Sequence, residues 1–541
     1  MAEQPLIDIS PENWRIVRDI LQRYVPDREV WAFGSRAKWT AKEFSDLDIA
    51  VIGEESISIG LMADLREAFQ ESVLPFKVDV VDWAAITPSF RKVVEADRVA
   101  LRFVELPADG PVWLYVRLGD YCDKIGSGST PKGGKEAYLS HGPYRLIRSQ
   151  NIYNDGFKYG GLAYISDEQA KKLDGVAVNA GDVLLNITGD SVARVCSAPS
   201  DVLPARVNQH VAIIRPSPIA FDARFVRYYL ATPQQQDLLL GMASSGATRD
   251  ALTKGMIESL RIPQPSLDEQ KAIADVLASF DDRIVLLRET NATLEAIAQA
   301  LFKSWFVNFD PVRAKAEGQE PEGVPPEIAE LFPSEFEDSE LGEIPKGWTV
   351  GRLGDLVGLR NERTKPSPIT EQRPYVPIEC ISSKSIFLAE SKSGIEAQSS
   401  LITFHRGDIV FGAMRPYFHK VCLAPFDGTT RTTAFVLAPR KAGQTNYCLF
   451  QLFANETIEF ATNHSEGSTI PYAKWNGSLD KMPIVIPPDT LVEHYSSLVD
   501  SFITRGIENM KQERVLSEAR DLLLPRLMSG MLSAEHEDVG A

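Results

Sequence analysis

The chain has 541 residues, few cysteines and no long apolar run. Its five cysteines are scattered, odd in number and free of any C-x-x-C pair. That pattern argues against a disulfide framework and a zinc site, and it predicts a reducing, cytoplasmic environment. The longest apolar runs fall well short of the ~18–20 residues that cross a bilayer, so we expect no membrane partner. Residues 1–10 also lack the basic and apolar regions of a signal peptide.

Basic residues are fewer than acidic ones, and they are unevenly distributed along the chain. The chain has 57 Lys and Arg against 74 Asp and Glu, a formal charge of −17, which taken alone argues against a nucleic-acid partner. Residues 1–110 carry 13 basic and 20 acidic side chains, whereas residues 117–261 carry 17 and 14, and residues 352–486 carry 15 and 12. Two blocks are therefore mildly basic, and the acidity belongs to the N-terminal region and the connecting segments.

The two basic blocks resemble each other, which indicates an internal duplication. Arg117-Leu-Gly-Asp120 opens the first block and Arg352-Leu-Gly-Asp355 opens the second. Each block continues with a Gly-Asp pair before an apolar run, at Gly181 and at Gly407, and each ends in a proline-marked strand followed by a helical pattern. These two pairs of points lie 235 and 226 residues apart, a period of whole domains. Short β-branched runs between turn residues predict strand-rich domains with a few helices.

A long helix is predicted after each block. Apolar residues recur there with alternating spacings of four and three, as in the seam of a coiled coil, with Asn291 as a polar position that fixes register. We expect the two helices to pack on each other, antiparallel if the blocks are related by a pseudo-twofold axis; the alternative is two unrelated surface helices. A forty-residue helix would span ~60 Å. The seam positions are Ile273, Leu277, Phe280, Ile284, Leu287, Asn291, Leu294, Ala298, Leu301 and Trp305, then Tyr495, Phe502, Leu516, Leu523 and Leu527.

Some parts of this pattern are less regular. Gly506, Glu513 and Arg520 interrupt the seam of the second helix. Residues 310–347, between the copies, are acidic and rich in proline, which predicts a solvated linker with one short helix at most.

Residues 1–105 have a different, alternating pattern of helices and strands. The sequence predicts a helix over 11–24 and strands over 29–33, 47–52 and 76–81, with helices between the strands.

Three aspartates of this region are expected to cluster. Asp46 and Asp48 alternate at the start of the second predicted strand, so both carboxylates project from one face. Asp79, on a neighbouring strand, can complete the cluster, whereas alternation turns Asp82 to the opposite face. Clustered carboxylates need hard cations, and Mg²⁺ held by two aspartates also binds a triphosphate. The alternative is an Asp-rich strand end that caps a turn.

A Gly-Ser pair precedes the aspartates. Gly34 lets the backbone approach a phosphate, Ser35 supplies a hydroxyl, and the following helix offers its N-terminus to an anion. Gly34-Ser35, ten residues, and then Asp46-Leu-Asp48 resembles the minimal nucleotidyltransferase signature of the DNA polymerase β-type superfamily. The resemblance implies that Asp46 and Asp48 hold two Mg²⁺ ions and that Asp79 is the general base or a third ligand. It also implies that Gly34, Ser35 and Arg36 bind a nucleoside triphosphate.

The rest of the chain resembles the specificity (S) subunits of type I restriction–modification systems. The resemblance rests on residues 126–132, 300–315, 340–348 and 520–530, which stand in the family's order. It implies two target recognition domains that each read half of a bipartite site in double-stranded DNA. The helices would separate the half-sites and dock two methyltransferase subunits, beside restriction and translocase subunits.

Two motifs of catalytic subunits are absent from the sequence. There is neither an Asn-Pro-Pro-Tyr/Phe methyltransferase motif nor a G-x-x-x-x-G-K-[ST] loop for ATP. Methylation, translocation and cleavage would therefore come from partner subunits, and we expect no cofactor for the specificity region.

Base edges and phosphates are read by basic, amide and hydroxyl side chains. For each single candidate the alternative is an ordinary surface charge or turn residue. The candidates are Lys132, Arg145, Arg148, Ser149, Gln150, Asn151, Asn208, Gln209 and His210 in the first block, and Arg363, Lys365, Arg415, Tyr417, Arg431 and Lys474 in the second.

We therefore expect a multidomain α+β chain with pseudo-twofold symmetry in its repeated part. Its parts are an α/β nucleotidyltransferase domain (1–105), two mixed α/β target recognition domains (110–262 and 348–486), two long antiparallel coiled-coil helices between them (263–309 and 487–531) and a linker (310–347).

Three functional hypotheses follow. The first is a DNA specificity subunit with a fused Mg²⁺-dependent nucleotidyltransferase. The second is primarily a nucleotidyltransferase of toxin–antitoxin type that modifies a protein or RNA and uses the repeat as a DNA-targeting platform. The third is a non-catalytic scaffold with a degenerate transferase domain, against which the intact aspartates and Gly34-Ser35 argue.

Overall fold

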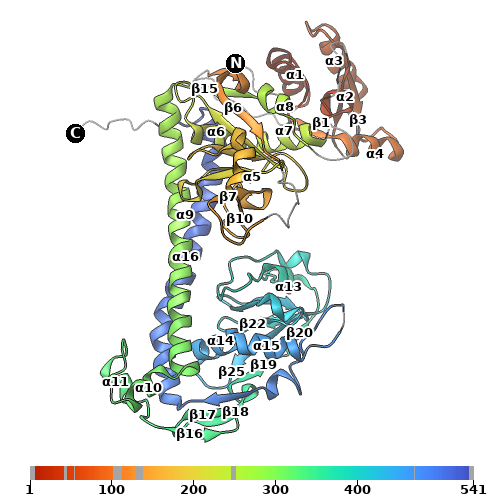
Figure 1. The fold of residues 1–541 in the computed structure, drawn as a ribbon. Coiled ribbons are helices and arrows are strands. Elements are labelled where there is room, and N and C mark those ends of the chain that lie inside the picture. The colour runs from red at the N-terminus through yellow and green to blue at the C-terminus, as the bar shows by residue number, and fades with distance from the viewer. Residues whose placement is uncertain are drawn as a thin grey trace, which may run out of the picture. The chain divides into compact units, whose positions relative to one another are not determined.

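The computed structural model describes residues 7–39, 41, 45–53, 55–101, 113–129, 138–244, 251–467 and 469–534. The predicted DNA contact Lys132 lies outside these residues. The chain divides into two units, one formed by Met1–Asp281 with Glu518–Ala541 and the other by Asp282–Ser517, and each contains part of both long helices (Figure 1). No helix in the described part of the chain is long and apolar enough to span a membrane.

The N-terminal domain is a four-stranded sheet in the order β3-β2-β1-β4, with β2 and β3 parallel and β1 antiparallel to both its neighbours. The first helix begins where predicted, because the Ser10 hydroxyl accepts the amide of Asn13 and Pro11 fits the first turn. Strand β4 and the last helix of the domain were not predicted. The elements are α1 (Pro11–Tyr24), β1 (Val30–Phe33), α2 (Gly34–Ala37), β2 (Leu47–Val51), α3 (Ile59–Gln70), β3 (Val78–Asp82), α4 (Pro88–Asp97) and β4 (Val99–Leu101).

The first recognition domain contains a four-stranded sheet, β12-β11-β14-β6, and a three-stranded sheet, β10-β7-β13. A strand from each end of the domain, β5 and β15, pairs to close it. Its main elements are β5 (Leu114–Arg117), β6 (Cys122–Ser127), β7 (Tyr144–Ile147), β8 (Ile152–Tyr153), β9 (Gly156–Phe157), β10 (Ala163–Ile165), α5 (Asp167–Lys172), β11 (Val183–Asn186), β12 (Val195–Ser197), β13 (Ala205–Val207), β14 (Val211–Pro216), α6 (Ala223–Ala231), α7 (Pro233–Ser244), α8 (Lys254–Ser259) and β15 (Arg261–Gln264).

The second recognition domain repeats the four-stranded sheet and the closing strand pair, but its three-stranded sheet is wholly antiparallel, whereas β7 and β13 of the first domain are parallel. Its four-stranded sheet has the order β23-β22-β25-β19, its three-stranded sheet has the order β20-β21-β24, and β18 pairs with β26 as β5 does with β15. Its elements are β18 (Thr349–Arg352), α12 (Leu353–Leu356), β19 (Val357–Leu359), β20 (Arg363–Thr364), α13 (Pro368–Glu371), β21 (Leu401–Phe404), β22 (Ile409–Gly412), β23 (Val421–Leu423), β24 (Gly428–Arg431), β25 (Ala434–Pro439), α14 (Thr445–Phe453), α15 (Asn455–Asn463) and β26 (Pro483–Ile486).

The repeated Gly-Asp pairs have a structural role. Asp182 and Asp408 are each only 3% exposed, directly before β11 and β22. Each carboxylate binds a guanidinium, that of Arg215 at 2.7 Å in the first copy and that of Arg360 at 2.8 Å in the second. A buried carboxylate needs such a partner, so the motif marks a buried ion pair in both copies, although the arginine comes from β14 in the first and from the residue after β19 (Val357–Leu359) in the second.

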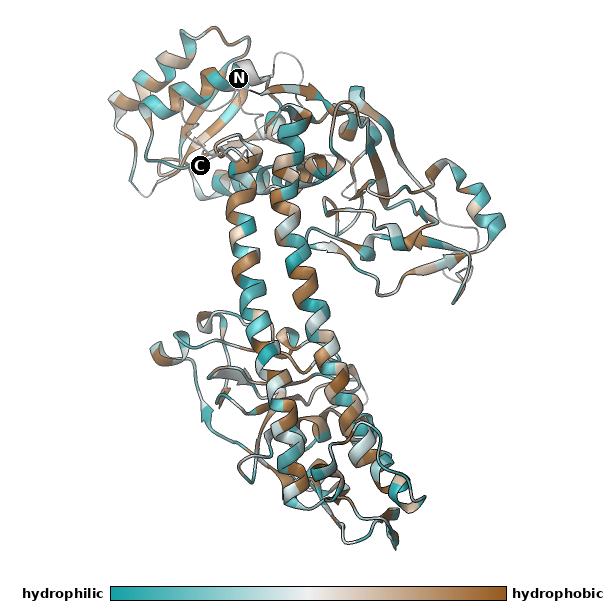
Figure 2. Cartoon of the chain, turned by 90° about the vertical axis from the view of Figure 1, so that its left-hand side faces the viewer, coloured by the Kyte–Doolittle hydropathy of each residue, from teal (hydrophilic) through white to brown (hydrophobic). Residues whose placement is uncertain are grey.

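The long helices are α9 (Leu267–Phe302), followed by a π-helical turn (Lys303–Val307), and α16 (Asp489–Met528). Apolar and polar residues alternate along both (Figure 2). In the second unit Arg288 pairs with Glu513 at 2.6 Å, and the Asn291 amide nitrogen donates to the Gly506 carbonyl at 3.0 Å. The Tyr495 hydroxyl donates to a carbonyl further along α9 at 3.0 Å. Because positions on α16 fall as those on α9 rise, the helices are antiparallel.

Every predicted seam residue is buried or half-buried. The three residues that interrupt the predicted seam, Gly506, Glu513 and Arg520, each form a polar contact with α9. Glu513 pairs with Arg288, Arg520 pairs with Asp281 at 2.6 Å, and Gly506 accepts the amide of Asn291. The sequence period alone could not reveal these partners, since they lie on the other helix.

Residues 310–347 differ from the predicted solvated linker. They form two short helices and a hairpin, and their apolar side chains belong to the core of the second unit. Phe332 packs on Trp305 with ring centroids 5.4 Å apart, and Phe309 packs on Trp348 at 5.6 Å. A few aromatic residues therefore anchor a segment whose acidic, proline-rich composition suggested solvation. The elements are α10 (Asp310–Ala316), α11 (Pro326–Ala329), β16 (Phe336–Ser339) and β17 (Gly342–Pro345).

The first recognition domain meets the helices through an ionic network. Asp281 on α9 accepts hydrogen bonds from Arg227 at 3.0 Å and from the Tyr228 hydroxyl at 2.7 Å, both on α6. It also accepts one from Arg520 of α16 at 2.6 Å. One carboxylate thus joins three helices within this unit.

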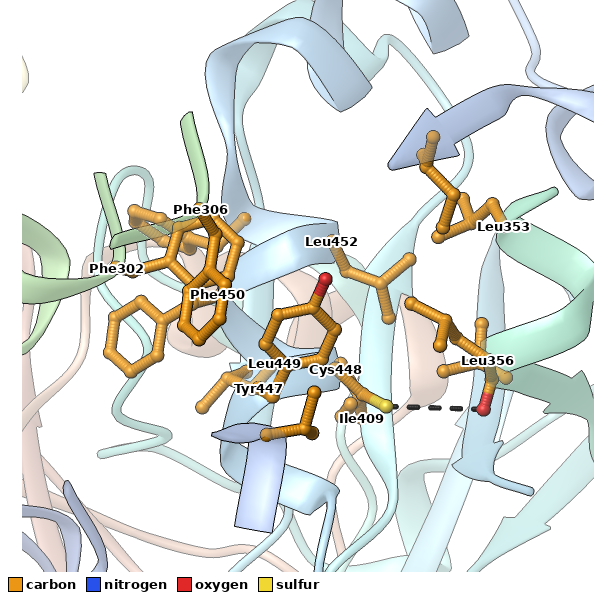
Figure 3. Close-up of a cluster of buried hydrophobic side chains, with 14 of the residues drawn as sticks. Phe302, Phe306, Leu353, Leu356, Ile409, Tyr447, Cys448, Leu449, Phe450 and Leu452 are labelled. Carbon is orange, nitrogen blue, oxygen red and sulfur yellow. Dashed lines mark hydrogen bonds between the residues drawn. The ribbon is translucent and has the colours of Figure 1, made fainter. Parts of the chain in front are cut away.

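The second recognition domain meets the helices through apolar side chains. Positions 222 residues from those of the ionic network carry Leu449, Phe450, Ile503 and Ala298, all at most 4% exposed. Phe302 and Phe306 lie beside Tyr447 and Phe450 in this cluster, with the Phe306–Tyr447 ring centroids 4.9 Å apart (Figure 3). The duplicated junctions therefore use opposite chemistry.

Gly506→Ala should destabilise the second unit. A Cβ atom at Gly506 would lie 2.1 Å from the Phe387 ring, and such overpacking costs about 1–3 kcal/mol. Gly241→Ala in α7 is the matched control, because a Cβ atom there meets nothing within 4 Å and the change should stabilise its helix by up to ~1 kcal/mol. Hydrogen exchange measured peptide by peptide should show faster exchange in α16 for Gly506→Ala alone. Unchanged or slower exchange there would contradict this packing.

Candidate functional sites

Two of the three predicted carboxylates lie next to each other in the N-terminal sheet. Strand register places Asp48 on β2 directly beside Asp79 on β3 and beside Phe33, the last residue of β1. Gly34 follows with φ +76°, and a Cβ atom on it would lie 2.5 Å from an Asp48 carboxylate oxygen. Only glycine therefore fits this position without moving the carboxylate.

The cluster is electrostatically strained. Burial, followed by the charges of Asp79 and Asp46, raises the pKa of Asp48, and Lys77 opposes this shift. Lys77 forms an ion pair with Asp79 at 2.5 Å, and this bond raises the pKa of Lys77. Negative charge that the protein itself only partly balances is what a divalent cation would stabilise.

The donor set suits a hard cation, although the carboxylates do not yet converge. Among the described residues no three His, Cys, Asp or Glu side chains stand close enough to hold a metal ion together. Joint coordination would require side-chain movement, because Asp79 is paired with Lys77. Asp82 accepts the amides of Ile57 at 2.9 Å and Ala84 at 3.1 Å, so it serves the backbone, in line with its predicted orientation away from the cluster.

Arg36, which we predicted to bind nucleotide, is only 6% exposed. Its guanidinium donates to the carbonyls of Ser45 at 2.8 Å and Asp8 at 2.6 Å, and it lies 3.9 Å from the centre of the Phe76 ring. It therefore holds the segment that leads into Asp46. The predicted helix after Gly34 is a single turn, α2, with Ser35 half-buried in it.

Several predicted DNA contacts in the first recognition domain instead hold a loop. Arg148 and Gln150 both donate to the carbonyl of Gly161, Gln150 at 3.0 Å. Asn151 is fully buried and donates to the Lys158 carbonyl at 2.8 Å. Asn208 is 5% exposed and accepts the amide of the residue two positions on. The asparagines are therefore structural residues here, because neither side chain reaches the surface.

Other candidates of this domain are more accessible. Arg145 is half-buried and donates to the Leu203 carbonyl at 3.1 Å. Gln209 is exposed, and its amide nitrogen lies 2.8 Å from a ring nitrogen of His210.

The second domain presents most of its candidates to solvent. Arg363, Lys365, Arg431, Lys474 and Tyr417 are exposed. Arg363 lies on β20 and Arg431 on β24, two strands of the three-stranded sheet, and Lys474 pairs with Glu466 at 2.6 Å.

Two further residues of the second unit, Phe418 and Glu295, were not predicted. Arg415 is half-buried, and beside it Phe418 is 44% exposed, an aromatic side chain on a turn that the search for polar contacts overlooked. Glu295 of α9 accepts the Ile386 amide at 2.9 Å and the Ser385 hydroxyl, and burial raises its pKa. Aligning the copies at their offset of 226 residues would have singled out Phe418, since the first copy has valine there.

Asp48→Asn should stabilise the N-terminal sheet at neutral pH in the presence of a chelator. Because the pKa of Asp48 is raised above 3.8 in the fold, its charged form costs stability above the raised pKa, and this cost disappears as the pH falls toward 3.8. Hydrogen exchange of peptides covering β2 and β3 should therefore give a larger opening free energy at pH 7, with the difference shrinking toward pH 4. Asp64→Asn, an exposed acid on α3, should change nothing. Equal protection at pH 7 would contradict the strained cluster.

Comparison with known proteins agrees with this layout. The "Type I restriction modification DNA specificity domain" model matches residues 112–296 and 345–515, and the "Polymerase beta, Nucleotidyltransferase" model matches residues 17–101. The type I restriction enzyme MjaIX specificity subunit of Methanocaldococcus jannaschii is 30% identical over 325 residues, which cover 57% of this chain and 69% of that protein. The HindI specificity subunit of Haemophilus influenzae is 23% identical over 433 residues, covering 71% and 93%.

The N-terminal domain has relatives of its own. The "probable protein adenylyltransferase MntA" of Haemophilus influenzae is 44% identical over 108 residues, which cover 20% of this chain and 95% of that protein. The matched segments are the two repeated domains with their helices and the sheet that carries the carboxylates. The chain therefore belongs to the type I restriction–modification specificity subunits, with a nucleotidyltransferase domain fused before its two recognition domains.

Proposed function

We propose that this chain directs a type I restriction–modification complex to a bipartite site in double-stranded DNA. The carrying observation is the duplication itself: two domains whose four-stranded sheets have one strand order, each packed on the antiparallel helices within its own unit. Each domain would read one half-site, and the helices would set the spacing. Two methyltransferase subunits and the restriction subunits would supply the chemistry, since the sequence has no methyltransferase or ATPase motif.

We infer that the N-terminal domain transfers a nucleotide from a nucleoside triphosphate to an acceptor. Asp46 and Asp48 would hold Mg²⁺, which supplies charge neutralisation at the triphosphate when bound. Asp79 would accept the proton of an acceptor hydroxyl. The oxygen of that hydroxyl would bond to the α-phosphorus as the bond from the α-phosphorus to pyrophosphate breaks. The relative named as a probable protein adenylyltransferase supports ATP as donor and a protein as acceptor.

The alternative is a chain that is primarily a nucleotidyltransferase of toxin–antitoxin type, with the repeat as a targeting platform. It would keep the same carboxylate chemistry but would need no methyltransferase partner. The extent of the matches favours the specificity role, since they cover residues 112–296 and 345–515 against residues 17–101.

Methylome sequencing tests the two activities together. Cells that express the chain with its methyltransferase subunits should methylate adenine in one bipartite motif. Asp46→Asn combined with Asp48→Asn should leave this motif unchanged, but it should abolish Mg²⁺-dependent transfer of labelled nucleotide by the purified complex.

The matched control removes two charges elsewhere in the same domain. Asp64→Asn with Glu67→Gln changes two exposed acids of α3 and should preserve both activities. Absence of any bipartite motif would refute the specificity role. A motif that shifts with the Asp46 and Asp48 changes would refute the independence of the two functions.

A further inference from the structure

In the four-stranded sheet of each recognition domain, the turn between the second and third strands along the chain has one backbone form with two different sets of side chains. It joins β11 to β12 in the first recognition domain and β22 to β23 in the second. The Val192 amide donates to the Gly189 carbonyl at 2.9 Å, and the Phe418 amide donates to the Arg415 carbonyl at 3.0 Å. Across the base of the first turn the Asn186 amide donates to the Arg194 carbonyl at 2.8 Å. Across the base of the second, the Gly412 amide donates to the Lys420 carbonyl at 2.7 Å. The two turns are thus hydrogen-bonded alike.

Both turns depend on two left-handed residues at equivalent positions. In the first copy these are Gly189 at φ +75° and Ala193 at φ +72°; in the second they are Arg415 at φ +52° and His419 at φ +53°. Bulky residues adopt this region at a cost, and such strain is concentrated at functional sites. The second copy therefore keeps large side chains at positions where the backbone favours small ones.

Hydrogen bonds to neighbouring segments fix both ends of the second turn. His419 is 6% exposed, its Nε2 atom lies 2.8 Å from the Phe453 carbonyl, and burial lowers the pKa of its imidazole. At the other end, the Arg415 amide donates to the Pro471 carbonyl at 2.8 Å. An anchored turn can present its side chains without losing much conformational entropy on binding.

The side chains between the anchors differ most. Val192 of the first copy is 8% exposed, whereas Phe418 at the equivalent position is 44% exposed. Tyr417 is 48% exposed, and its ring lies 4.8 Å from that of Phe418. An adjacent pair of exposed aromatic rings on a strained, anchored turn is costly unless a ligand covers it.

The charged residues around the second turn indicate which kind of ligand covers the two rings. Residues 412–426 contain Arg415 and Lys420 and no acidic residue, whereas the first turn carries Asp190 against Arg194. The Arg415 Nε atom is also buried without an acceptor among the described residues. The Lys420 ammonium donates to the Ile378 carbonyl at 2.7 Å, which leaves Arg415 as the cation of this turn. Arg415 and the two rings together fit a phosphate beside stacked bases, because aromatic side chains stack on bases and basic ones bind the backbone.

We propose that Tyr417 and Phe418 form a wedge that inserts into a base step of the half-site read by the second recognition domain. Insertion of apolar side chains between base pairs unstacks and kinks duplex DNA. The first domain, with Ser191 and Val192 at these positions, makes no such insertion, so the two half-sites are deformed differently. This inference rests on the proposed DNA-recognition function and deepens it.

The test uses the complete complex with its methyltransferase subunits and a duplex that carries the motif found by methylome sequencing. 2-Aminopurine is placed in turn at each position of both half-sites except the methylated adenine, and its fluorescence reports unstacking on binding. Tyr417→Ser with Phe418→Val gives the second turn the first copy's side chains. Ile369→Ser and Ile395→Ser, both highly exposed apolar positions of the same domain, are the matched controls.

We expect one step in the second domain's half-site to brighten with the native complex and none in the other half-site. The wedge variant should lose this signal and bind about tenfold or more weakly, in line with the loss of base stacking, while the controls bind normally. The wedge is refuted if no step brightens, or if the variant keeps both signal and affinity. It is also refuted if the variant fails to assemble with methyltransferase subunits, since the rings would then dock protein. If the native complex has no bipartite motif at all, the proposed function fails first.

Discussion

The antiparallel pairing of α9 and α16 is the constraint on which both recognition domains depend. Asn291 and Asn509 lie buried in the seam, joined to each other at 2.8 Å, and Arg288 meets Glu513. A buried amide or carboxylate without a partner costs stability, so these contacts disfavour any slip of one helix along the other. Apolar seam residues give the pair its affinity, and the polar ones give it a single register.

The recognition domains use this pair in different ways. Asp281 ties the first domain to both helices through charged hydrogen bonds, whereas the second domain buries Phe302, Phe306 and Tyr447 in a continuous apolar core. The two copies share the strand order of the four-stranded sheet and the buried aspartate of the Gly-Asp motif, but their junctions differ. The turns that face a ligand diverged as well, as Val192 and Phe418 illustrate. A protein that recognises two different half-sites needs a shared fold in both recognition domains and different side chains on the turns that contact DNA.

Sequence periodicity and alternation predicted the features that depend on near neighbours. The four-three spacing located the seam, and the helical pattern located the first helix over 11–24. The strand pattern put Asp48 and Asp79 on neighbouring strands, where the register now pairs them. Features that depend on distant partners escaped prediction.

The missed features share this cause. Asn151 and Asn208 have the polar side chains of DNA contacts, but the fold buries them. The segment 310–347 has the composition of a linker, yet Phe332 packs on Trp305 in a core that also includes Tyr447 and Tyr495 from far along the chain.

Inserting one heptad into each helix tests the central claim most directly. Seven residues placed after Leu287 and seven after Glu513 lie at the same level of the pair and preserve the seam, and they lengthen it by ~10 Å. If the pair sets the separation of the half-sites, methylome sequencing should find both half-sites unchanged and their spacing increased by about three base pairs, at ~3.4 Å each. Full methylation of the original motif with its original spacing would contradict the account.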